Sequence, residues 1–411
     1  MMGNETDTLA YRVAFGGAVA KADAALRIRE LAKSRGVFFA SIYPLYRALA
    51  QGILVGDFTV PALNIRGMTY DCARAIFRVA KRLDAGAFVF ELARSEMEYT
   101  LQRPAEYAAV IMAAALAEGW SGPVFVGGDH FQFKAGEGGE LAALKILAKE
   151  ALAAGFYNID IDASTLVDLA KTDERAQQAE NVRNTLELAR YIREIQPKDI
   201  TVSIGGEIGH IGGRNSTVAD LKAFLEGFLA EWPKTLPSLS KISIQTGTSH
   251  GGTILPTGEL ANPAVDLAVI PKLSALCKRY KIAGVVQHGA STLSNELLGK
   301  FPLAGAVEIH LATGIQNGIM DHSSFPQLLQ EKISKWIESD LKNEWEPTWN
   351  STQAVYKLRK KAWGRFKEEI WNIDPQAKIM LTGALEEKVA NWFGLLNIAD
   401  SKRTVDSLIR L

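Results

Sequence analysis

Eight short apolar runs alternate with longer stretches of helical periodicity, and this alternation constrains the fold more than any other feature of the sequence. The runs lie at residues 57–64, 86–92, 123–129, 157–162, 200–207, 242–247, 284–288 and 305–310. Each is followed by a glycine or polar residue and then by a helical pattern, which is typical of βα units in a parallel sheet. Because eight such units close a (β/α)8 TIM barrel, we predict this α/β fold for the chain.

Helices are predicted between the runs and at both ends of the chain. Those between the runs span residues 70–83, 105–118, 139–154, 181–195, 218–232 and 265–280. A helical lead-in covers roughly residues 21–50, and the tail has amphipathic patterns at residues 328–341, 353–371 and 385–393. We therefore divide the chain into a lead-in (1–50), a catalytic barrel (51–322) and a C-terminal helical extension (323–411). The tail holds six of the eight tryptophans, so we expect it to pack on the barrel or on a partner subunit.

The composition favours a small-molecule partner. Lys plus Arg equals Asp plus Glu at 46 each, so no overall charge attracts nucleic acid or a membrane surface. Cys72 and Cys277 are the only cysteines, which excludes a disulfide framework and a cysteine-based metal cluster and suits a reducing cytosol. The chain shows neither a signal-like N-terminal segment nor an apolar stretch long enough to span a bilayer, and we predict a cytoplasmic protein.

Four of the six histidines lie at or just beyond the ends of predicted strands, where a barrel forms its active site: His130, His250, His288 and His310. One such histidine would usually be an ordinary hydrogen-bonded residue, but four of them indicate a site. Imidazole ligands suit a catalytic Zn²⁺, and other divalent ions accept the same donors. We assign His130, His250 and His288 as metal ligands, with Glu207 as an extra or alternate ligand. Asp162 is either a further ligand or a residue that orients an imidazole.

Small residues follow the later strands, and their backbone N–H groups are suited to bind a phosphate. The two loops are His250-Gly251-Gly252 and the run from Gly289 to Thr292. We expect the substrate or its phosphate to contact Asn64, Gly251, Gly289, Ala290, Ser291, Ala312 and Thr313. The alternative is that the glycines only permit tight turns between strand and helix.

Two other patterns are interpreted as structural. The glycines at residues 205–209 (GGEIG) have the wrong spacing for a dinucleotide site. The basic cluster of Lys357, Arg359, Lys360 and Lys361 is interpreted as a solvated helix face rather than a nucleic-acid site.

Seven motifs, in this order and spacing, resemble those of the class II, metal-dependent fructose-bisphosphate and tagatose-bisphosphate aldolases. They are VPALN (60–64), GGDH (127–130), NIDIDAS (158–164), GGEIGHIGG (205–213), GTSHGG (247–252), QHGAST (287–292) and EIHLATGIQN (308–317). The resemblance spans roughly residues 45–317 and implies a (β/α)8 barrel, a homodimer or homotetramer, and a zinc ion on His130, His250 and His288.

The resemblance also implies roles for individual residues. Asp129 matches the aspartate that moves a proton on the C4 hydroxyl of the substrate, and Glu207 matches a carboxylate near the metal. The phosphate loop of the family matches Gly251, Gly289, Ser291 and Thr313. In such a reaction the metal polarises the ketose carbonyl and stabilises the enediolate, while a carboxylate takes the hydroxyl proton.

The chain departs from the family pattern around this implied metal site. Asn215 stands where a glutamate of a mobile loop is expected, and His310 replaces an asparagine that contacts the enediolate. Further replacements are Ala93, Gly127, Ile254 and Ala312. These changes indicate a different substrate or a neighbouring reaction. His310 becomes a candidate acid/base, and its alternatives are a hydrogen-bonding substitute for asparagine or an additional metal ligand.

We therefore favour a lyase that reversibly cleaves a ketose phosphate or bisphosphate through a metal-stabilised enediolate, in carbohydrate metabolism such as glycolysis. The alternative is a ketose or ketose-phosphate epimerase on the same metal site. A third hypothesis, a barrel that binds or assembles without turnover, is disfavoured because a decayed site would rarely keep the ligands and the neighbouring aspartates together. The expected partner of either enzyme is a small sugar or sugar phosphate.

Overall fold

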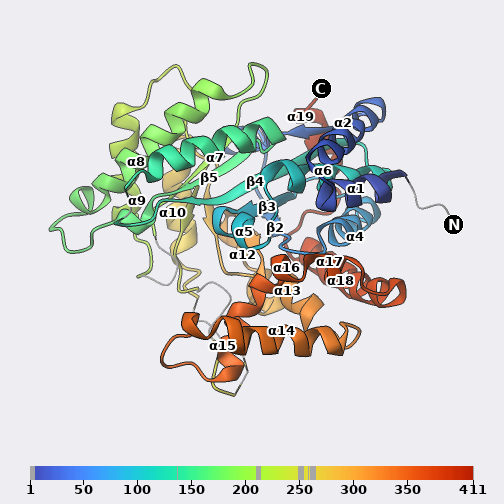
Figure 1. The fold of residues 1–411 in the computed structure, drawn as a ribbon. Helices are drawn as coiled ribbons and strands as arrows, with labels where there is room; N and C mark the ends of the chain where they lie inside the picture. Colours follow the sequence, from blue (N-terminus) through green and yellow to red (C-terminus); the bar gives the residue numbers. More distant parts are fainter. Residues whose placement is uncertain are drawn as a thin grey trace.

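Eight parallel strands form a closed barrel in the computed structural model, which describes residues 5–136, 138–209, 214–248, 254–257, 259 and 265–410. The strands are β2 (Val60–Asn64), β3 (Val89–Ala93), β4 (Gly122–Gln132), β5 (Asn158–Asp162), β6 (Ser203–Glu207), β7 (Lys241–Ile244), β8 (Val285–Gln287) and β9 (Ala306–Leu311). Each pairs with the next along the chain, and β9 pairs with β2, with His310 opposite Ala62, to close the ring. The predicted (β/α)8 barrel is confirmed (Figure 1).

Helices connect the strands. They are α4 (Thr69–Arg82), α5 (Arg94–Tyr99), α6 (Pro104–Ala117), α7 (Glu140–Ala154), α8 (Glu174–Ile195), α9 (Val218–Glu231), α10 (Val269–Arg279), α11 (Asn295–Leu298), α12 (Phe301–Ala304), α13 (Thr313–Met320) and the 3-10 turn η1 (Ser164–Leu166). Local sequence sets several of their ends. Thr217 and Asp220 form a reciprocal capping box that starts α9, and Gly155 takes the left-handed conformation (φ 102°) that ends α7.

The lead-in contains a strand that the helical pattern did not predict. It consists of α1 (Glu5–Phe15), α2 (Ala18–Ser34), β1 (Val37–Ala40) and α3 (Tyr43–Ala50). Strand β4 is longer than its neighbours, and its residues 122–125 precede the part that pairs with β3 and β5. β1 pairs with these four residues in parallel and so covers an edge that would otherwise expose unpaired backbone groups.

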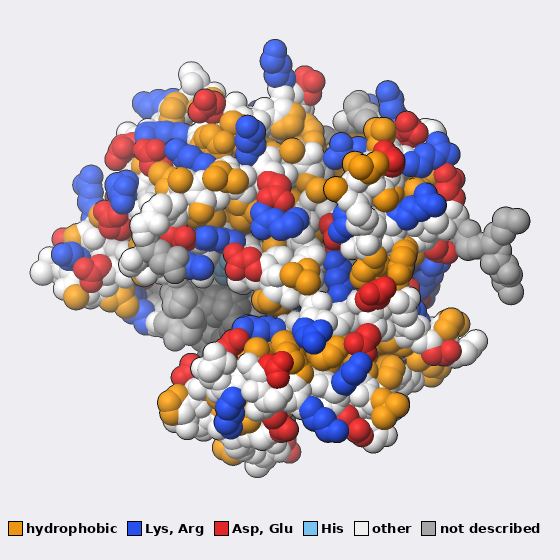
Figure 2. Space-filling model, in the orientation of Figure 1, with side chains coloured by type: hydrophobic (Ala, Val, Ile, Leu, Met, Phe, Trp, Pro, Cys, Tyr) orange, Lys and Arg blue, Asp and Glu red, His pale blue; other side chains and the backbone are white. Residues whose placement is uncertain are grey.

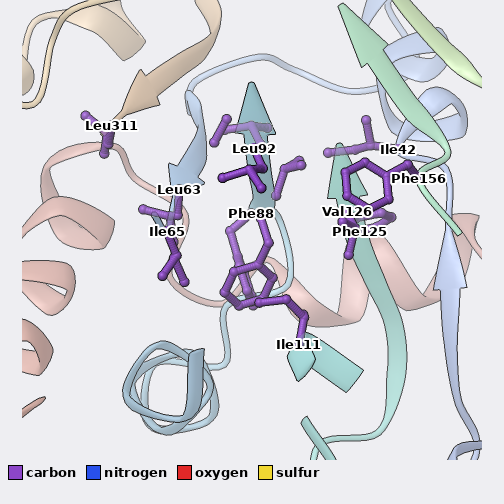
Figure 3. Close-up of a cluster of buried hydrophobic side chains, with 14 of the residues drawn as sticks. Ile42, Leu63, Ile65, Phe88, Leu92, Ile111, Phe125, Val126, Phe156 and Leu311 are labelled. Atoms are coloured by element: carbon purple, nitrogen blue, oxygen red, sulfur yellow. The ribbon is translucent and has the colours of Figure 1, made fainter. Parts of the chain in front are cut away.

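A continuous apolar core fills the space between the barrel strands and the surrounding helices. Figure 3 shows part of it, including Leu63 of β2, Leu92 of β3 and Ile111 of α6. Alternate residues of the buried strands supply this layer, and the helices contribute the apolar faces that their periodicity predicts. The core therefore holds the strand ends, and the side chains that follow them, in fixed positions.

The C-terminal extension lies along one side of the barrel, from its mouth to its opposite end (Figure 1). It consists of α14 (Gln327–Asp340), η2 (Lys342–Glu344), α15 (Ser351–Leu358), η3 (Arg359–Lys361), α16 (Ala362–Arg365), α17 (Lys367–Trp371), α18 (Pro375–Leu395) and α19 (Lys402–Leu408). The Trp363 ring lies against Gly67 in the loop after β2, α18 packs on α4, and Lys402 of α19 touches Gly86 before β3. None of the described helices has the length and apolar character needed to cross a membrane.

The basic cluster in this extension is not a solvated helix face, so that prediction is wrong. Arg359 pairs with Asp321 and donates to the Asn317 Oδ1 atom at 2.8 Å, with only 13% of its side chain exposed. Lys361 pairs with Glu344. Lys360 lies on the wall of the cavity at the barrel mouth. The segment folds as a 3-10 turn between short helices, which points its basic residues in different directions.

Candidate active site

A cavity of about 340 Å³ opens at the carboxyl ends of the barrel strands. Asp129 and His130 of β4, His288 after β8 and His310 of β9 line it, together with the loops after β2 and β3. The 3-10 turn η3 of the C-terminal extension completes one side. Figure 2 shows the surface hollowed between the barrel and the lobe that this extension forms. The cavity therefore lies where a (β/α)8 barrel carries its active site.

An irregularity in β4 turns His130 toward this cavity. The pairing of β4 with β5 shifts register between Gly128 and Phe131, and His130 adopts a left-handed conformation (φ 40°) that residues with a side chain rarely take. Gly128 is required there because a Cβ atom would lie 2.2 Å from the Phe131 ring. The strand predicted to end at Asp129 thus continues to Gln132, and the bulge places Asp129 and His130 side by side at the mouth.

Three imidazoles surround one carboxylate oxygen at the centre of the site. The ring centroids of His130 and His288 are 4.3 Å apart, and those of His288 and His310 are 4.1 Å apart. The Asp129 Oδ1 atom lies 3.7 Å from His130 Nε2, 3.9 Å from His288 Nδ1 and 3.3 Å from His310 Nδ1. This oxygen is buried and has no hydrogen-bond partner among the described residues. One nitrogen of each ring therefore faces the same small volume.

The other nitrogen of each ring is held by a neighbour. His130 Nδ1 lies 3.1 Å from Asp162 Oδ2 and 3.3 Å from Glu207 Oε2. His288 Nε2 lies 3.0 Å from the hydroxyl of Ser243 on β7. Asp162 is itself fixed by Ser164, whose hydroxyl donates to Asp162 Oδ1 at 2.6 Å. Such partners fix the orientation and tautomer of imidazoles that bind a metal.

His310 is held by a buried charged network inside the barrel. Its Nε2 lies 2.7 Å from Glu308 Oε1, and its Nδ1 lies 2.8 Å from Glu91 Oε2 on β3. Glu308 also accepts hydrogen bonds from Tyr46 and from Lys241, whose ammonium group lies 2.9 Å from Asp160. These contacts inside the barrel fix the His310 ring, so its position beside Asp129 does not depend on solvent.

Burial and the concentration of carboxylates shift the pKa of several of these groups. Burial, reinforced by the nearby Asp162, raises the pKa of Glu207 to about 8. Burial also raises the pKa of Glu91 to about 8, against the opposing effect of His310. For Asp129 burial acts in the same direction, but the imidazoles of His130 and His310 overcome it and hold the pKa of its carboxyl well below the usual value. The raised pKa values of Glu207 and Glu91 reflect the cost of burying their charged forms, which a bound cation would offset.

Two groupings of described side chains have the donors for a divalent ion: Asp129 with His288 and His310, and His130 with Glu207 and His288. In each, the potential ligand atoms lie within 4.8 Å of one another. The unpartnered Asp129 oxygen and the mixed nitrogen and oxygen donors fit Zn²⁺ or a similar ion. A third grouping, of Asp160, Glu308 and His310, already contains the ammonium group of Lys241 between its two carboxylates and has no need of a metal.

The residues expected to bind substrate are placed as follows. Asn64, Gly289, Ser291, Ala312 and Thr313 line the cavity, whereas Ala290 is buried and is not part of its wall. Ser291 Oγ accepts a hydrogen bond from the backbone N–H of Gly314 at 2.9 Å, which joins the loop after β8 to the start of α13. His250 and Gly251 lie outside the described residues.

Sequence reasoning missed several residues of the site. Glu91 and Glu308 are single charged residues within apolar runs, and Lys241 begins one. A lone charge in a buried strand requires a partner, and this requirement is the signal that could have identified them. Four cations of the cavity wall lie outside the strands, where the sequence carries no such signal: Arg66 and Lys134 in loops, Arg94 at the start of α5, and Lys360 in the extension.

Comparison with known proteins identifies the family. Over residues 46–368 the sequence matches the family described as fructose-bisphosphate aldolase class-II. The chain belongs to this family. The span covers the barrel and the C-terminal extension as far as the start of α17, and so includes Lys360. Class-II aldolases are typically metal-dependent, and membership supports an enzyme of aldolase or epimerase type that acts on a small sugar phosphate or a related sugar. A comparison with curated proteins found no match.

Solved structures of similar fold include both aldolases and an epimerase. The fructuronate–tagaturonate epimerase of Cohnella laeviribosi is 11% identical, with 89% of this chain and 84% of that chain covered and a TM-score of 0.61. A probable tagatose 6-phosphate kinase of Sinorhizobium meliloti 1021 is 13% identical, with 84% and 100% covered and a TM-score of 0.53. The fructose-bisphosphate aldolase of Campylobacter jejuni is 16% identical, with 89% and 96% covered and a TM-score of 0.50. At these identities the likeness concerns the fold.

Proposed function

We propose that this class-II aldolase family member is a metal-dependent lyase that reversibly cleaves a ketose phosphate or bisphosphate. The observation that carries the proposal is the position of Asp129 Oδ1, buried among the inward nitrogens of His130, His288 and His310. His130 and His288 would hold the ion, with Glu207 as an alternate ligand, and the sequence assigns His250 to the same set. When bound, the ion would supply electrophilic polarisation of the ketose carbonyl.

In this mechanism Asp129 is the proton carrier. Its carboxylate takes the proton of the C4 hydroxyl as the C3–C4 bond breaks, so C4 leaves as an aldehyde and the bonding electrons pass to the ketose fragment. In the reverse direction the same carboxyl returns the proton to the new hydroxyl. The neighbouring imidazoles keep Asp129 ionised, and Asp162 and Ser243 keep two of those rings in orientation.

The substrate is proposed to lie along the cavity wall. Its phosphate would contact Gly289, Ser291 and Thr313, whose backbone and hydroxyl groups follow β8 and β9. Asn64, held through its Nδ2 group by Glu96 at 2.6 Å, would contact the sugar hydroxyls. The cavity volume of about 340 Å³ suits a molecule of this size.

A second reaction, ketose or ketose-phosphate epimerisation, is favoured by one observation. His310 brings a second titratable group within 3.3 Å of Asp129 Oδ1, where the family pattern has an asparagine. Two adjacent proton carriers suit the removal of a proton from one face of a carbon and its return to the other. The fold likeness to an epimerase of uronic acids agrees with this alternative but does not decide it.

Product analysis separates the two reactions. The purified protein, loaded with Zn²⁺, is incubated with fructose and tagatose, their 6-phosphates and their 1,6-bisphosphates, and the products are resolved by chromatography. Release of triose or triose phosphate supports cleavage, whereas formation of an epimer without trioses would overturn the lyase in favour of the epimerase. Activity is expected to disappear with EDTA and to return with Zn²⁺, and Asp129→Asn is expected to be inactive while still binding the ion.

A further inference from the structure

Lys360 is the feature of the cavity that the proposed mechanism does not use. It belongs to η3 of the C-terminal extension, yet it lines the cavity together with Arg66, which follows β2, and with Glu96 and Tyr99 of α5. Its ammonium group lies 5.7 Å from the centroid of the Tyr99 ring. The extension, which packs along the outside of the barrel, thus contributes a cation to the site.

The two arginines of the cavity wall are paired with carboxylates, whereas Lys360 is not. Arg66 Nε donates to Glu96 Oε1 at 2.7 Å, and the Arg94 guanidinium donates to Glu140, with one bond of 3.1 Å. The second oxygen of Glu96 accepts hydrogen bonds from Asn64 Nδ2 and from the backbone N–H of Ala93, at 2.6 and 2.8 Å. Glu96 is therefore fully engaged, and within the described part of the chain Lys360 forms no ion pair or hydrogen bond.

An ammonium group that is largely removed from water and lacks a carboxylate partner is costly. Burial and the positive charge of Arg66 both lower the pKa of Lys360, which reflects this cost. An anion on the cavity side would offset it, because that side is where the protein leaves room for a ligand.

We infer that Lys360 is a specificity residue that binds an acidic substituent of the substrate, either a carboxylate or a phosphate. This inference rests on the proposed function, because it requires a sugar in the cavity that contains Asp129 and the imidazoles. It makes the extension part of the binding site, because a residue outside the barrel then distinguishes acidic sugars from neutral ones.

Binding of unreactive probes tests the inference without turnover. Gluconate, glucitol 6-phosphate and neutral glucitol have no ketone or aldehyde group to react, and their dissociation constants are measured by isothermal titration calorimetry. We expect the wild-type protein to bind at least one of the two acids about 10- to 100-fold more tightly than glucitol. Lys360→Gln should lose this preference and Lys360→Arg should retain most of it. The matched control is Lys361→Gln, because Lys361 pairs with Glu344 away from the cavity.

The outcomes distinguish this inference from the proposed function. Equal binding of the three probes by the wild-type protein, or an unchanged preference in Lys360→Gln with its melting temperature intact, would overturn it. The acid that loses affinity in Lys360→Gln tells whether the site takes a carboxylate or a phosphate. On any ketose with a carboxylate or phosphate that the enzyme turns over, the same variant should raise KM by about 10-fold or more and leave kcat nearly unchanged. Selective acid binding without turnover of any ketose would contradict the proposed function while leaving the role of Lys360 supported.

Discussion

At the scale of single residues, the proposed metal centre depends on nitrogens that face Asp129. His288 provides one of them, and its ring is held from behind by Ser243. We predict that His288→Ala reduces the bound divalent ion from about one per chain to background, because a catalytic site with three protein ligands rarely retains its ion after losing one. The measurement is metal analysis after dialysis against Zn²⁺.

The matched control for this prediction is His322→Ala. His322 accepts a hydrogen bond from the backbone N–H of Ser324 and is not part of the cavity wall, so its removal should leave the ion content unchanged. Retention of a full equivalent of ion by His288→Ala would remove this residue from the ligand set.

For Asp162 we predict a partial loss of Zn²⁺ affinity rather than loss of the ion. Its Oδ2 atom lies 3.1 Å from His130 Nδ1, and its other oxygen is held by Ser164. If Asp162 orients His130 rather than binding the ion, Asp162→Asn should weaken Zn²⁺ affinity by about 10- to 100-fold and still bind one ion at saturation. Competition with a chromogenic chelator measures the affinity. Asp168→Asn, on an exposed segment nearby, should match the wild type, and an unaltered affinity in Asp162→Asn would refute the orienting role.

Some residues of the cavity could be predicted from the sequence, and others could not. Asp129, His130, His288 and His310 follow strands, and the parallel barrel necessarily brings strand ends together. Glu91, Glu308 and Lys241 form pairs that exist only after the barrel closes, so the sequence marks them as lone charges at apolar runs but does not identify their partners. Lys360 is far along the chain from the strands it faces, and its basic neighbours resemble a solvated surface in sequence.

At the scale of secondary-structure elements, the bulge in β4 determines where the His130 side chain lies. Gly128→Ala would place a methyl group 2.2 Å from the Phe131 ring, inside a buried strand. We predict a loss of about 1–3 kcal/mol in the free energy of unfolding, because the ring or the strand must move. Activity should fall more steeply than the loss of folded protein explains, because the same shift displaces His130. Urea unfolding and a steady-state assay measure the two effects.

Gly138→Ala is the control for that substitution. Gly138 precedes α7, and a Cβ atom there meets no other atom within 4 Å. Its stability and activity should therefore stay near the wild-type values. A Gly128→Ala protein that is as stable and as active as Gly138→Ala would show that the bulge tolerates a side chain and does not position His130.

The elements themselves were predictable where their periodicity was long and uninterrupted. All eight barrel strands overlap the predicted runs, because both faces of most strand residues are buried and the runs are therefore largely apolar. Strand β4 extends furthest beyond its run, from Gly122 to Gln132. Strand β1 was missed because its four residues are set by the exposed edge of β4 and not by a pattern of their own. The helix predicted at 353–371 is broken into short pieces where Gly364 packs against the backbone of Tyr99, with a would-be Cβ 2.1 Å from its carbonyl oxygen.

At the scale of the whole molecule, the barrel and the C-terminal extension share one hydrophobic core. The ring of Phe393 on α18 lies 5.6 Å from that of Phe88, which precedes β3 in the barrel wall. Trp363 of α16 donates a hydrogen bond to Gln316 of α13 at 3.1 Å, near the cavity. We therefore propose that the extension is an integral part of the folded unit and not a separable module, which also explains how it can hold Lys360 in place.

This proposal predicts that the barrel and the extension unfold in a single transition. A destabilising substitution in the extension should therefore shift the whole transition. Phe393→Ala should lower the free energy of unfolding by about 3–5 kcal/mol, because it leaves a cavity in the shared core. Met380→Ala, at an exposed position of the same helix, should change it by less than about 0.5 kcal/mol. Far-ultraviolet circular dichroism reports mainly on the barrel, and tryptophan fluorescence reports mainly on the extension, so the two urea curves should coincide in each variant. Two separate transitions, with only the fluorescence curve shifted in Phe393→Ala, would mean that the extension unfolds on its own and that the barrel does not need it.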